Sequence, residues 1–326
     1  MKNINISVDQ KGNGDFKSIN QALSFASSII DASVFISIKA GTYKENIEIL
    51  RDNITLCGDD RKNTIITGNL YAKEILPDTS KRGTFRTATV RTFGKNISLK
   101  NLTIVNSSGS GKIVGQALAL YTDGDRIDVE NCSIIANQDT LFTAPLPPTN
   151  KDGTITGMGP RGFEKRTQGR HHFRSCYIEG DIDFIFGGAM ALFQDCILTC
   201  HKNGYFTAPC TPENQLFGYL FENCTLNIDK KNNIQTEDNY GVFLGRPWRP
   251  YAKAVFINCK LDSNIKPELW NNWDNPPSEK TVFFATDEKT SHDFNPLPWS
   301  KVFTKKAAEE YLAAFKDLFF SENAVL

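Results

Sequence analysis

Asn131-Cys132-Ser133-Ile134 is one of six similar four-residue stretches that recur along the chain. Each begins with a small polar residue, continues with Cys or Leu and then any residue, and ends with Ile or Leu. The other five are Asn101-Leu102-Thr103-Ile104, Ser175-Cys176-Tyr177-Ile178, Asp195-Cys196-Ile197-Leu198, Asn223-Cys224-Thr225-Leu226 and Asn258-Cys259-Lys260-Leu261. In a strand the second and fourth residues point the same way, and the polar residue suits a bend.

The intervals between these stretches range from 20 to 44 residues, which fits coils joined by loops of different length. A regular repeat of short strands is typical of a solenoid. The sequence therefore predicts an all-β fold, most simply a right-handed parallel β-helix, which is a single-stranded solenoid.

Five of the eight cysteines occupy the second position of the repeat. In that register they stack inward as small buried hydrophobic residues, and we favour this interpretation over disulfides. No Cys-x-x-Cys pair is present, so we expect no zinc cluster and no other metal site.

Two helices and one long loop are expected to flank or interrupt the coils. Ser18 to Gln21 has the spacing of a capping box, and it precedes an apolar helical face. That face consists of Ile19, Ala22, Leu23, Ala26 and Ile30. A second apolar stripe predicts a C-terminal helix over 304–320, capped by Thr304. Residues 144–170 are rich in Pro and Gly, which predicts an inserted loop within a single domain that spans residues 1–326.

The composition excludes several classes of protein. Lys and Arg together number 37, as do Asp and Glu, so the net charge is zero and bulk capture of nucleic acid is not expected. No segment approaches the ~18 continuous apolar residues of a membrane helix, so we expect no membrane association. The N-terminus lacks the apolar core of a secretory signal. We expect a monomer that is cytoplasmic as the chain stands, or extracellular if a leader has been removed.

Four segments carry polar residues of the kinds that do chemistry, and each lies next to a coil of the predicted solenoid. Glutamine amides can donate to a developing oxyanion, paired aspartates can divide nucleophile and acid roles, and arginine can hold one aspartate ionised. Singly, each also has a structural interpretation, as a ladder glutamine, a surface ion pair or a core tryptophan. The segments are Gly115-Gln116-Ala117-Leu118-Ala119-Leu120, Gln138-Asp139-Thr140-Leu141-Phe142, Gly180-Asp181-Ile182-Asp183-Phe184-Ile185-Phe186-Gly187 and Leu244-Gly245-Arg246-Pro247-Trp248.

In combination and in this order, the four segments resemble the pectin methylesterases, or pectinesterases, of carbohydrate esterase family 8. The resemblance covers nearly the whole chain. It also includes the stretches Val8–Phe16, Ala40–Tyr43 and Gly83–Thr89 and ends near Trp299. The family fold is a right-handed parallel β-helix, which agrees with the repeat.

The resemblance also implies roles for individual residues. Asp183 is implied to be the nucleophile that attacks the methyl ester carbonyl of a galacturonate residue. Asp139 is implied to protonate the departing methanol and then to activate water. Gln116 and Gln138 are implied to form the anion hole, and Arg246 to orient Asp183 and keep it ionised.

Three further residues are implied to contact the substrate, and no cofactor is implied. They are Trp248, Thr84 and Phe186. The expected partner is methyl-esterified homogalacturonan or its oligogalacturonides.

The segment between Phe142 and Cys176 is much longer than its counterpart in the plant members of the family. The loop over residues 144–170 makes up most of this segment. It contains five basic and two acidic residues, although the whole chain is neutral. A basic loop beside the site would attract a polyanion, and a long loop could wall off one end of the binding surface. We expect from this a preference for short methylated oligogalacturonides, although a solvated insertion without substrate contact is an equal alternative.

Other classes share the predicted fold. A pectate lyase would need calcium ligands and a basic proton abstractor, and a polygalacturonase would need carboxylates spaced for a water. The set of two glutamines, two aspartates and one arginine fits neither. The chain has no Gly-x-Ser-x-Gly elbow of a serine hydrolase. A non-catalytic polysaccharide-binding solenoid is the remaining alternative, and retention of all five polar residues argues against it.

Overall fold

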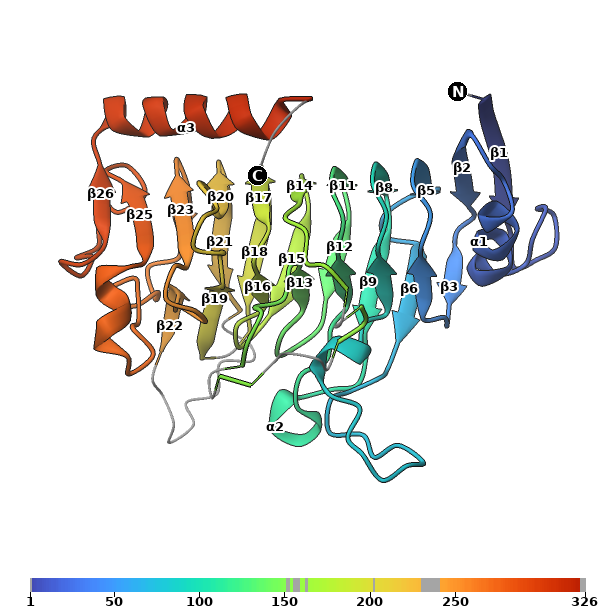
Figure 1. The fold of residues 1–326 in the computed structure, drawn as a ribbon, viewed down its shortest axis with the longest axis horizontal. Helices are drawn as coiled ribbons and strands as arrows, with labels where there is room; N and C mark the ends of the chain where they lie inside the picture. The colour runs from blue at the N-terminus through green and yellow to red at the C-terminus, as the bar shows by residue number, and fades with distance from the viewer. Residues whose placement is uncertain are drawn as a thin grey trace.

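The computed structural model describes residues 2–150, 153–154, 159–161, 164–201, 203–229 and 241–322. The chain winds into coils, and successive coils add strands to three parallel sheets that run along the length of the molecule (Figure 1). In the coil that begins at residue 170, strands β14 (Arg170–Arg174), β15 (Tyr177–Gly180) and β16 (Ile185–Gly187) enter sheets A, B and C in turn. The predicted parallel β-helix is therefore confirmed.

Sheet A has eleven strands and sheets B and C have eight and seven. Sheet A contains β1 (Lys2–Val8), β2 (Ala32–Ile38), β5 (Ile54–Gly58), β8 (Ile97–Lys100), β11 (Ile127–Glu130), β14 (Arg170–Arg174), β17 (Met190–Gln194), β20 (Tyr219–Glu222), β23 (Lys253–Ile257), β25 (Phe283–Asp287) and β26 (Lys301–Phe303). Sheet B contains β3 (Gly41–Tyr43), β6 (Thr64–Gly68), β9 (Thr103–Asn106), β12 (Ser133–Ile135), β15 (Tyr177–Gly180), β18 (Ile197–Cys200), β21 (Thr225–Ile228) and β24 (Lys260–Leu261). Sheet C contains β4 (Ile47–Ile49), β7 (Val90–Thr92), β10 (Leu120–Thr122), β13 (Leu141–Thr143), β16 (Ile185–Gly187), β19 (Gly204–Pro209) and β22 (Val242–Gly245).

The polar residue of each repeat forms the corner between sheets A and B. All six of these residues have a positive φ, between 49° and 58°. Asn and Asp tolerate this left-handed conformation better than most residues because their short side chains bond locally. Asn131 also donates from its amide to Asn101 on the previous coil at 2.8 Å. The repeat thus places a turn, as the sequence predicts.

The cysteines of the repeat point into the solenoid, as predicted, and all eight cysteines of the chain are free thiols. Their Sγ atoms donate to backbone carbonyls of the preceding coil, for example from Cys176 to Val129 at 3.3 Å. Cys57, outside the repeat, is the one cysteine that is half-buried. Beside this ladder, the rings of Phe173, Phe193, Phe221 and Phe256 stack with centroid separations of 4.7, 4.4 and 4.2 Å.

The flanking helices begin where the caps predict. Helix α1 (Ile19–Ser27) follows Ser18, whose side chain accepts from the Gln21 amide, and it buries Ile19, Ala22, Leu23 and Ala26. Ile30 lies beyond the end of this helix and is exposed, so its predicted place on the apolar face is wrong. The short elements α2 (Gly111–Val114), η1 (Thr84–Arg86) and η2 (Pro276–Lys280) lie in connections between strands.

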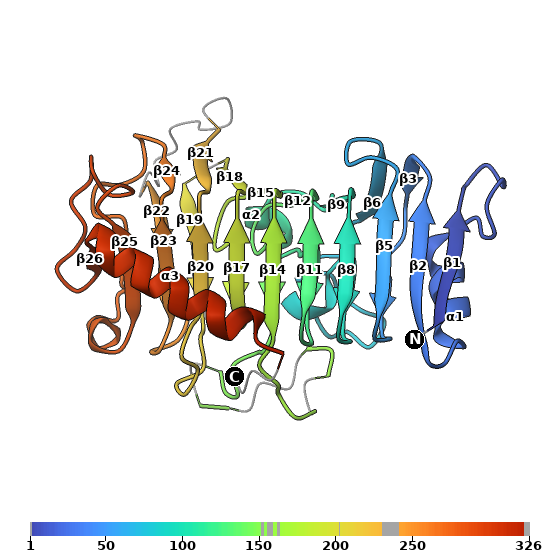
Figure 2. The same ribbon diagram turned by 90° about the horizontal axis from the view of Figure 1, so that it is seen from above.

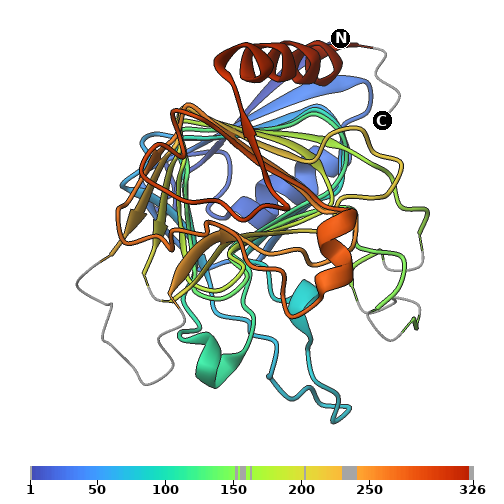
Figure 3. The same cartoon turned by 90° about the vertical axis from the view of Figure 1, so that its left-hand side faces the viewer.

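Helix α3 (Lys305–Phe320) is capped by Thr304 and packs on the outside of sheet A, where Ala308, Phe315 and Phe319 are buried. Figures 2 and 3 show it lying across the strands of this sheet. Helix α2 lies on the opposite side of the solenoid from α3 (Figures 1 and 3).

The expected loop over residues 144–170 leaves after β13, and its described residues before Arg170 contain no helix and no strand element. The Arg166 guanidinium donates to the Leu146 carbonyl at 3.1 Å, and the Arg249 guanidinium donates to the Thr149 carbonyl at 3.0 Å. Arg170 itself belongs to β14, so the loop ends one residue earlier than predicted.

Candidate active site

Asp139 and Asp183 occupy equivalent positions on adjacent coils. Strand β13 pairs with β16 so that Leu141 faces Ile185, and each aspartate precedes its strand by two residues. Neighbouring strands lie about 4.8 Å apart. Both aspartates have a positive φ, 63° and 52°, so each sits on a tight corner that leads into sheet C. The backbone amide of Asp139 donates to the Ile182 carbonyl at 3.0 Å, which ties the two corners together.

Asp183 is held by Arg246 through two parallel hydrogen bonds. Nε donates to Oδ1 at 2.8 Å, and a terminal guanidinium nitrogen donates to Oδ2 at 2.7 Å. The Asp183 residue is only 7% exposed, so little water competes with this pair. A bidentate arginine favours the ionised form of a carboxyl group and fixes its orientation.

Arg246 is itself clamped between two aromatic rings. Its guanidinium carbon lies 3.9 Å from the centroid of Tyr205 and 3.6 Å from that of Trp273. Arginine stacks well on aromatic faces because its planar cation is weakly hydrated. Tyr205 and Trp273 therefore hold the Arg246 guanidinium in place, and Arg246 in turn orients the Asp183 carboxylate.

The surroundings of Asp139, unlike those of Asp183, disfavour the charged form of its carboxyl group. Burial, and after it the charges of Asp183 and Asp181, raise the pKa of Asp139 well above its usual range, although part of the side chain reaches the surface. Arg246 opposes this shift but does not cancel it. The pair thus combines a carboxyl group that keeps its proton with a carboxylate that is bound to a cation.

Gln138 lies on the same coil as Asp139 and Gln116 on the preceding coil, and both residues are partly exposed. Gln138 directly precedes Asp139, and its carbonyl accepts from the Ala117 amide at 3.1 Å, next to Gln116. Gly111 lets helix α2 approach the Gln138 side chain, because a Cβ atom there would lie 2.6 Å from Oε1. Both glutamines are thus placed on the Asp139 side of the pair.

Phe186 and Trp248 meet in an aromatic cluster on the outer face of sheet C. Phe142 and Phe186 alternate with the inward-facing Leu141 and Ile185, so they point away from the interior. The Phe186 ring lies 5.7 Å from the Trp248 ring. We call Phe85, Phe142, Phe186 and Trp248 the outer aromatic cluster.

Thr84 directly precedes Phe85, a member of this cluster. The Phe85 ring lies 6.4 Å from Trp248 and 6.3 Å from Phe186. The Thr84 carbonyl accepts from the hydroxyl of Thr87, the residue that follows η1, at 2.6 Å. The structure thus places Phe85 against the predicted contact residues Trp248 and Phe186, and the role of Thr84 stays a prediction.

Comparison with known proteins agrees with this arrangement. The family model described as Pectinesterase matches residues 5–158 and 166–311. The chain belongs to the pectinesterase family.

Two plant relatives and one bacterial structure show how far the likeness extends. The chain is 33% identical to pectinesterase 2 of Citrus sinensis over 86% of its own length and 50% of the relative. It is 30% identical to probable pectinesterase/pectinesterase inhibitor 64 of Arabidopsis thaliana, over 95% of the chain and 50% of the relative. The chain thus spans about half the length of these relatives. Pectin methylesterase PemA from Erwinia chrysanthemi superposes with a TM-score of 0.74 at 25% identity, over 100% of this chain and 99% of that one. This likeness confirms the right-handed parallel β-helix.

Several residues that contact the candidate site residues were not predicted from the sequence. Tyr205 occupies the position on β19 that matches Asp183 on β16, since Ile185 pairs with Thr207, so the register could have found it. Trp273 lies in an irregular segment and carries no pattern. Phe85 adjoins the predicted Thr84, and its outward position follows only from the fold.

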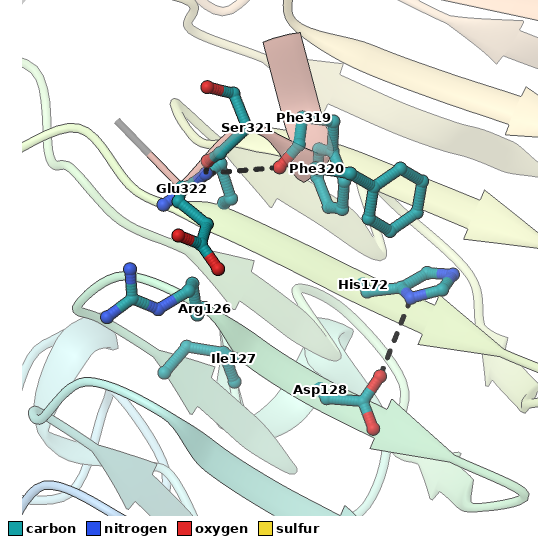
Figure 4. A pocket seen from close by; sticks show the side chains of 9 residues that line it. Arg126, Ile127, Asp128, His172, Phe319, Phe320, Ser321 and Glu322 are labelled. Atoms are coloured by element: carbon teal, nitrogen blue, oxygen red, sulfur yellow. Dashed lines mark hydrogen bonds and ion pairs between the residues drawn. The ribbon is translucent and has the colours of Figure 1, made fainter. Parts of the chain in front are cut away.

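Two cavities of similar volume lie away from the aspartate pair. One, of about 590 Å³, lies where the end of α3 meets β11 and β14, and Figure 4 shows its lining residues, with His172 joined to Asp128. The other, also about 590 Å³, lies beside the first half of α3. Within the described ranges no three His, Cys, Asp or Glu side chains gather as a metal site. No described helix has both the length and the apolar character needed to span a membrane.

Proposed function

We propose that this chain hydrolyses methyl esters of galacturonate residues in homogalacturonan, giving methanol and a free carboxylate. One observation carries the proposal. Asp183 is bound by Arg246 at 2.7 and 2.8 Å, one coil away from Asp139, whose pKa is raised. Two carboxyl groups whose surroundings separate their protonation states can share nucleophile and acid roles. The single-domain organisation over 1–326, with 144–170 as an inserted loop, remains part of this proposal.

Asp183 acts as the nucleophile in the first half of the reaction. A carboxylate oxygen of Asp183 attacks the ester carbonyl carbon, and the carbonyl oxygen becomes an oxyanion. Collapse of this intermediate breaks the bond to the methoxy group and leaves an anhydride on Asp183. Arg246 holds the attacking carboxylate in one orientation, which lowers the entropy that the step must lose.

Asp139 moves the protons. It donates its proton to the departing methoxy oxygen, so that methanol leaves. The Asp139 carboxylate then takes a proton from a water molecule, which attacks the anhydride carbonyl. Asp183 leaves as a carboxylate, Asp139 is again protonated, and the sugar acid loses its proton to solvent. The sum is ester plus water to methanol plus acid.

Gln116 and Gln138 supply the donors for the oxyanion. Gln138 lies on the same coil as Asp139 and Gln116 on the preceding coil, and both residues are partly exposed. Neutral donors stabilise the developing charge without shifting the proton balance of the two aspartates. The outer aromatic cluster, with Trp248 at its exposed edge, gives a flat wall for the sugar ring.

The decisive experiment measures methanol release from methylated pectin and from short methylated oligogalacturonides. We expect release from both, with no ultraviolet-absorbing unsaturated product and no new reducing ends. Unsaturated products would identify a lyase, and reducing ends without methanol would identify a glycoside hydrolase. Binding of pectin without any of these products would identify the non-catalytic solenoid.

A further inference from the structure

A buried charge cluster lies directly behind the aspartate pair. Ile135 pairs with Glu179, and Gly180 pairs with Cys200. Asn137, Asp181 and His201 therefore share one register on three consecutive coils, at the turn from sheet B toward sheet C. Asp181 is 3% and His201 is 8% exposed.

The His201 ring is surrounded by acceptors on both of its nitrogens. Nδ1 lies 3.5 Å from the Glu179 carboxylate. Nε2 lies 3.2 Å from the Asn137 side-chain oxygen and 3.7 Å from the Asp181 carboxylate. Only the imidazolium form can donate from both nitrogens. Burial opposes this form, but Asp181 and Glu179 outweigh it and raise the pKa of His201 to about 9.

Asp181 is fixed close to Asp139 through the backbone of Ile182. The Ile182 amide donates to Asp181 Oδ1 at 2.6 Å, and the Ile182 carbonyl accepts from the Asp139 amide at 3.0 Å. The backbone of Gly204 packs closely against this turn, because a Cβ atom at Gly204 would lie only 2.0 Å from the Asp181 carbonyl oxygen. The negative charge of Asp181 is one of those that raise the pKa of Asp139.

We propose that Asp181 and His201 form a positioning pair for the ester hydrolysis: His201 orients the Asp181 carboxylate, and Asp181 in turn acts on Asp139, the proposed acid, from the adjacent coil. The inference rests on the proposed function. Asp139, Asp181 and Asp183 are close together. Among the described residues, Arg246 binds Asp183 and His201 lies 3.7 Å from Asp181, whereas the neighbouring charges of Asp183 and Asp181 disfavour the charged form of Asp139.

Several described charged groups face Asp181, His201 and Asp139. His201 faces Glu179 and Asp181, and Glu179 also accepts from the Tyr177 hydroxyl at 2.5 Å. Asp229 follows His201 in the same register on the next coil. Asp139 faces Asp183 and Asp181, which raise its pKa, and Arg246, which lowers it.

The first test is the pH dependence of kcat/KM for methanol release. Asp181→Asn removes the charge but keeps the acceptor for Ile182, so Asp139 loses its proton at lower pH. The alkaline limb should move to lower pH by about one to two units, the usual effect of one near charge. His201→Gln removes the cation that orients the Asp181 carboxylate, so the side chain no longer holds its place near Asp139 and the limb should move the same way.

A double variant of Asp181 and His201, and a variant that keeps a positive charge at position 201, complete the set of pH measurements. Asp181→Asn combined with His201→Gln should show no further shift, because His201 acts through Asp181. His201→Lys should restore the position of the limb. The exposed His292→Gln is the matched control and should leave the profile unchanged. An unshifted limb in Asp181→Asn, or a limb that moves to higher pH in His201→Gln, would overturn the proposal.

The second test does not depend on activity. NMR titration of the four histidines should show one that keeps its proton to about pH 9, and its pKa should fall in Asp181→Asn. A titration of His201 near pH 6.5 in the unsubstituted chain would contradict the ion pair. Absence of methanol release from that chain would refute the proposed function. Activity with an unshifted profile in Asp181→Asn would refute only this inference.

Discussion

Asp139 and Asp183 are identical side chains at matching positions on adjacent coils, and only their neighbours distinguish them. Arg246 contacts Asp183 directly, whereas Asp139 receives burial and the charges of two other aspartates. The division of chemical roles therefore depends on which side chains the solenoid stacks beside each corner.

The raised pKa of Asp139 predicts how the rate depends on pH. The acid form is required for methanol to leave, and a raised pKa preserves this form to higher pH than an ordinary aspartate would. kcat/KM should fall on the alkaline side as Asp139 loses its proton. Asp139→Asn should reduce the rate severely and remove this alkaline fall. If Asp139→Asn kept full activity, the role of Asp139 as the acid would be contradicted.

The glutamine amides predict a loss in rate rather than in binding. Gln116→Ala and Gln138→Ala should each lower kcat by roughly 10²-fold, the usual loss for one oxyanion donor. Steady-state kinetics of methanol release distinguish a fall in kcat from a change in KM. Lys112→Ala, an exposed position on α2, is a control that should retain the parental kcat. A variant whose KM alone changes would refute the anion-hole assignment.

At the scale of single elements, the corner residues explain why the fold could be predicted. Asn, Asp and Ser at the six corners, followed by Cys or Leu, mark both the turn and the inward register of the next strand. The capping residues Ser18 and Thr304 likewise mark the starts of α1 and α3. These signals are local, so they can be recognised in the sequence without knowing how the rest of the chain folds.

Asn131 offers a test of the corner conformation. Its φ is 49°, where glycine has no steric penalty and alanine costs about 1–2 kcal/mol. Asn131→Gly should therefore be more stable than Asn131→Ala by about 1 kcal/mol, measured by urea denaturation. At Ser133, in the adjacent strand β12, the order should reverse. Equal stabilities of the two Asn131 variants would contradict the corner account.

The site was only partly predictable because its supports come from distant coils. Asp139, Asp183 and Arg246 lie in segments that can be recognised in the sequence. Trp273, which stacks on Arg246, lies 27 residues further along the chain, and no sequence pattern marks it. Phe85 packs on Trp248 only because a connection folds back over sheet C. His201 shows nothing in the sequence that relates it to Asp181. Contacts of this kind follow from the winding of the coils.

At the scale of the whole molecule, the first residues of the loop over 144–170 are held against the outer aromatic cluster. Leu146 and Ala144 join the buried residues around this cluster, and Thr149 is bound by Arg249, next to Trp248. The basic excess of the loop is smaller in effect than the sequence suggests, because acidic residues outside the loop face two of its arginines. Arg170 is buried against Asp125 at 2.7 Å, and Arg161 lies 4.0 Å from Asp123.

The position of this loop predicts an effect on substrate length. Replacing residues 150–165 by a short Gly-Ser turn retains Arg166 and Arg170, which bind Leu146 and Asp125. We expect the variant to gain activity on polymeric pectin relative to short oligogalacturonides. A loop of native length with Lys151, Arg161 and Lys165 changed to Gln separates charge from size. An unchanged ratio in a folded, active loop-shortened variant would contradict the hypothesis.

Chelators test the alternative chemistry of this fold. The proposed reaction uses only carboxyl, amide and guanidinium groups, so methanol release should be the same with and without a chelator of divalent ions. Inhibition that added calcium reverses would favour a lyase instead.

Methanol release by Asp183→Asn tests the central claim most directly. Asparagine keeps the size of the side chain and an acceptor for Arg246, but it cannot attack an ester as a carboxylate does. We predict that the variant unfolds at a temperature close to that of the unsubstituted chain and loses at least about 10³-fold in kcat, on the scale of other nucleophile removals. Retention of more than a few per cent of the activity by the folded variant would contradict Asp183 as the nucleophile.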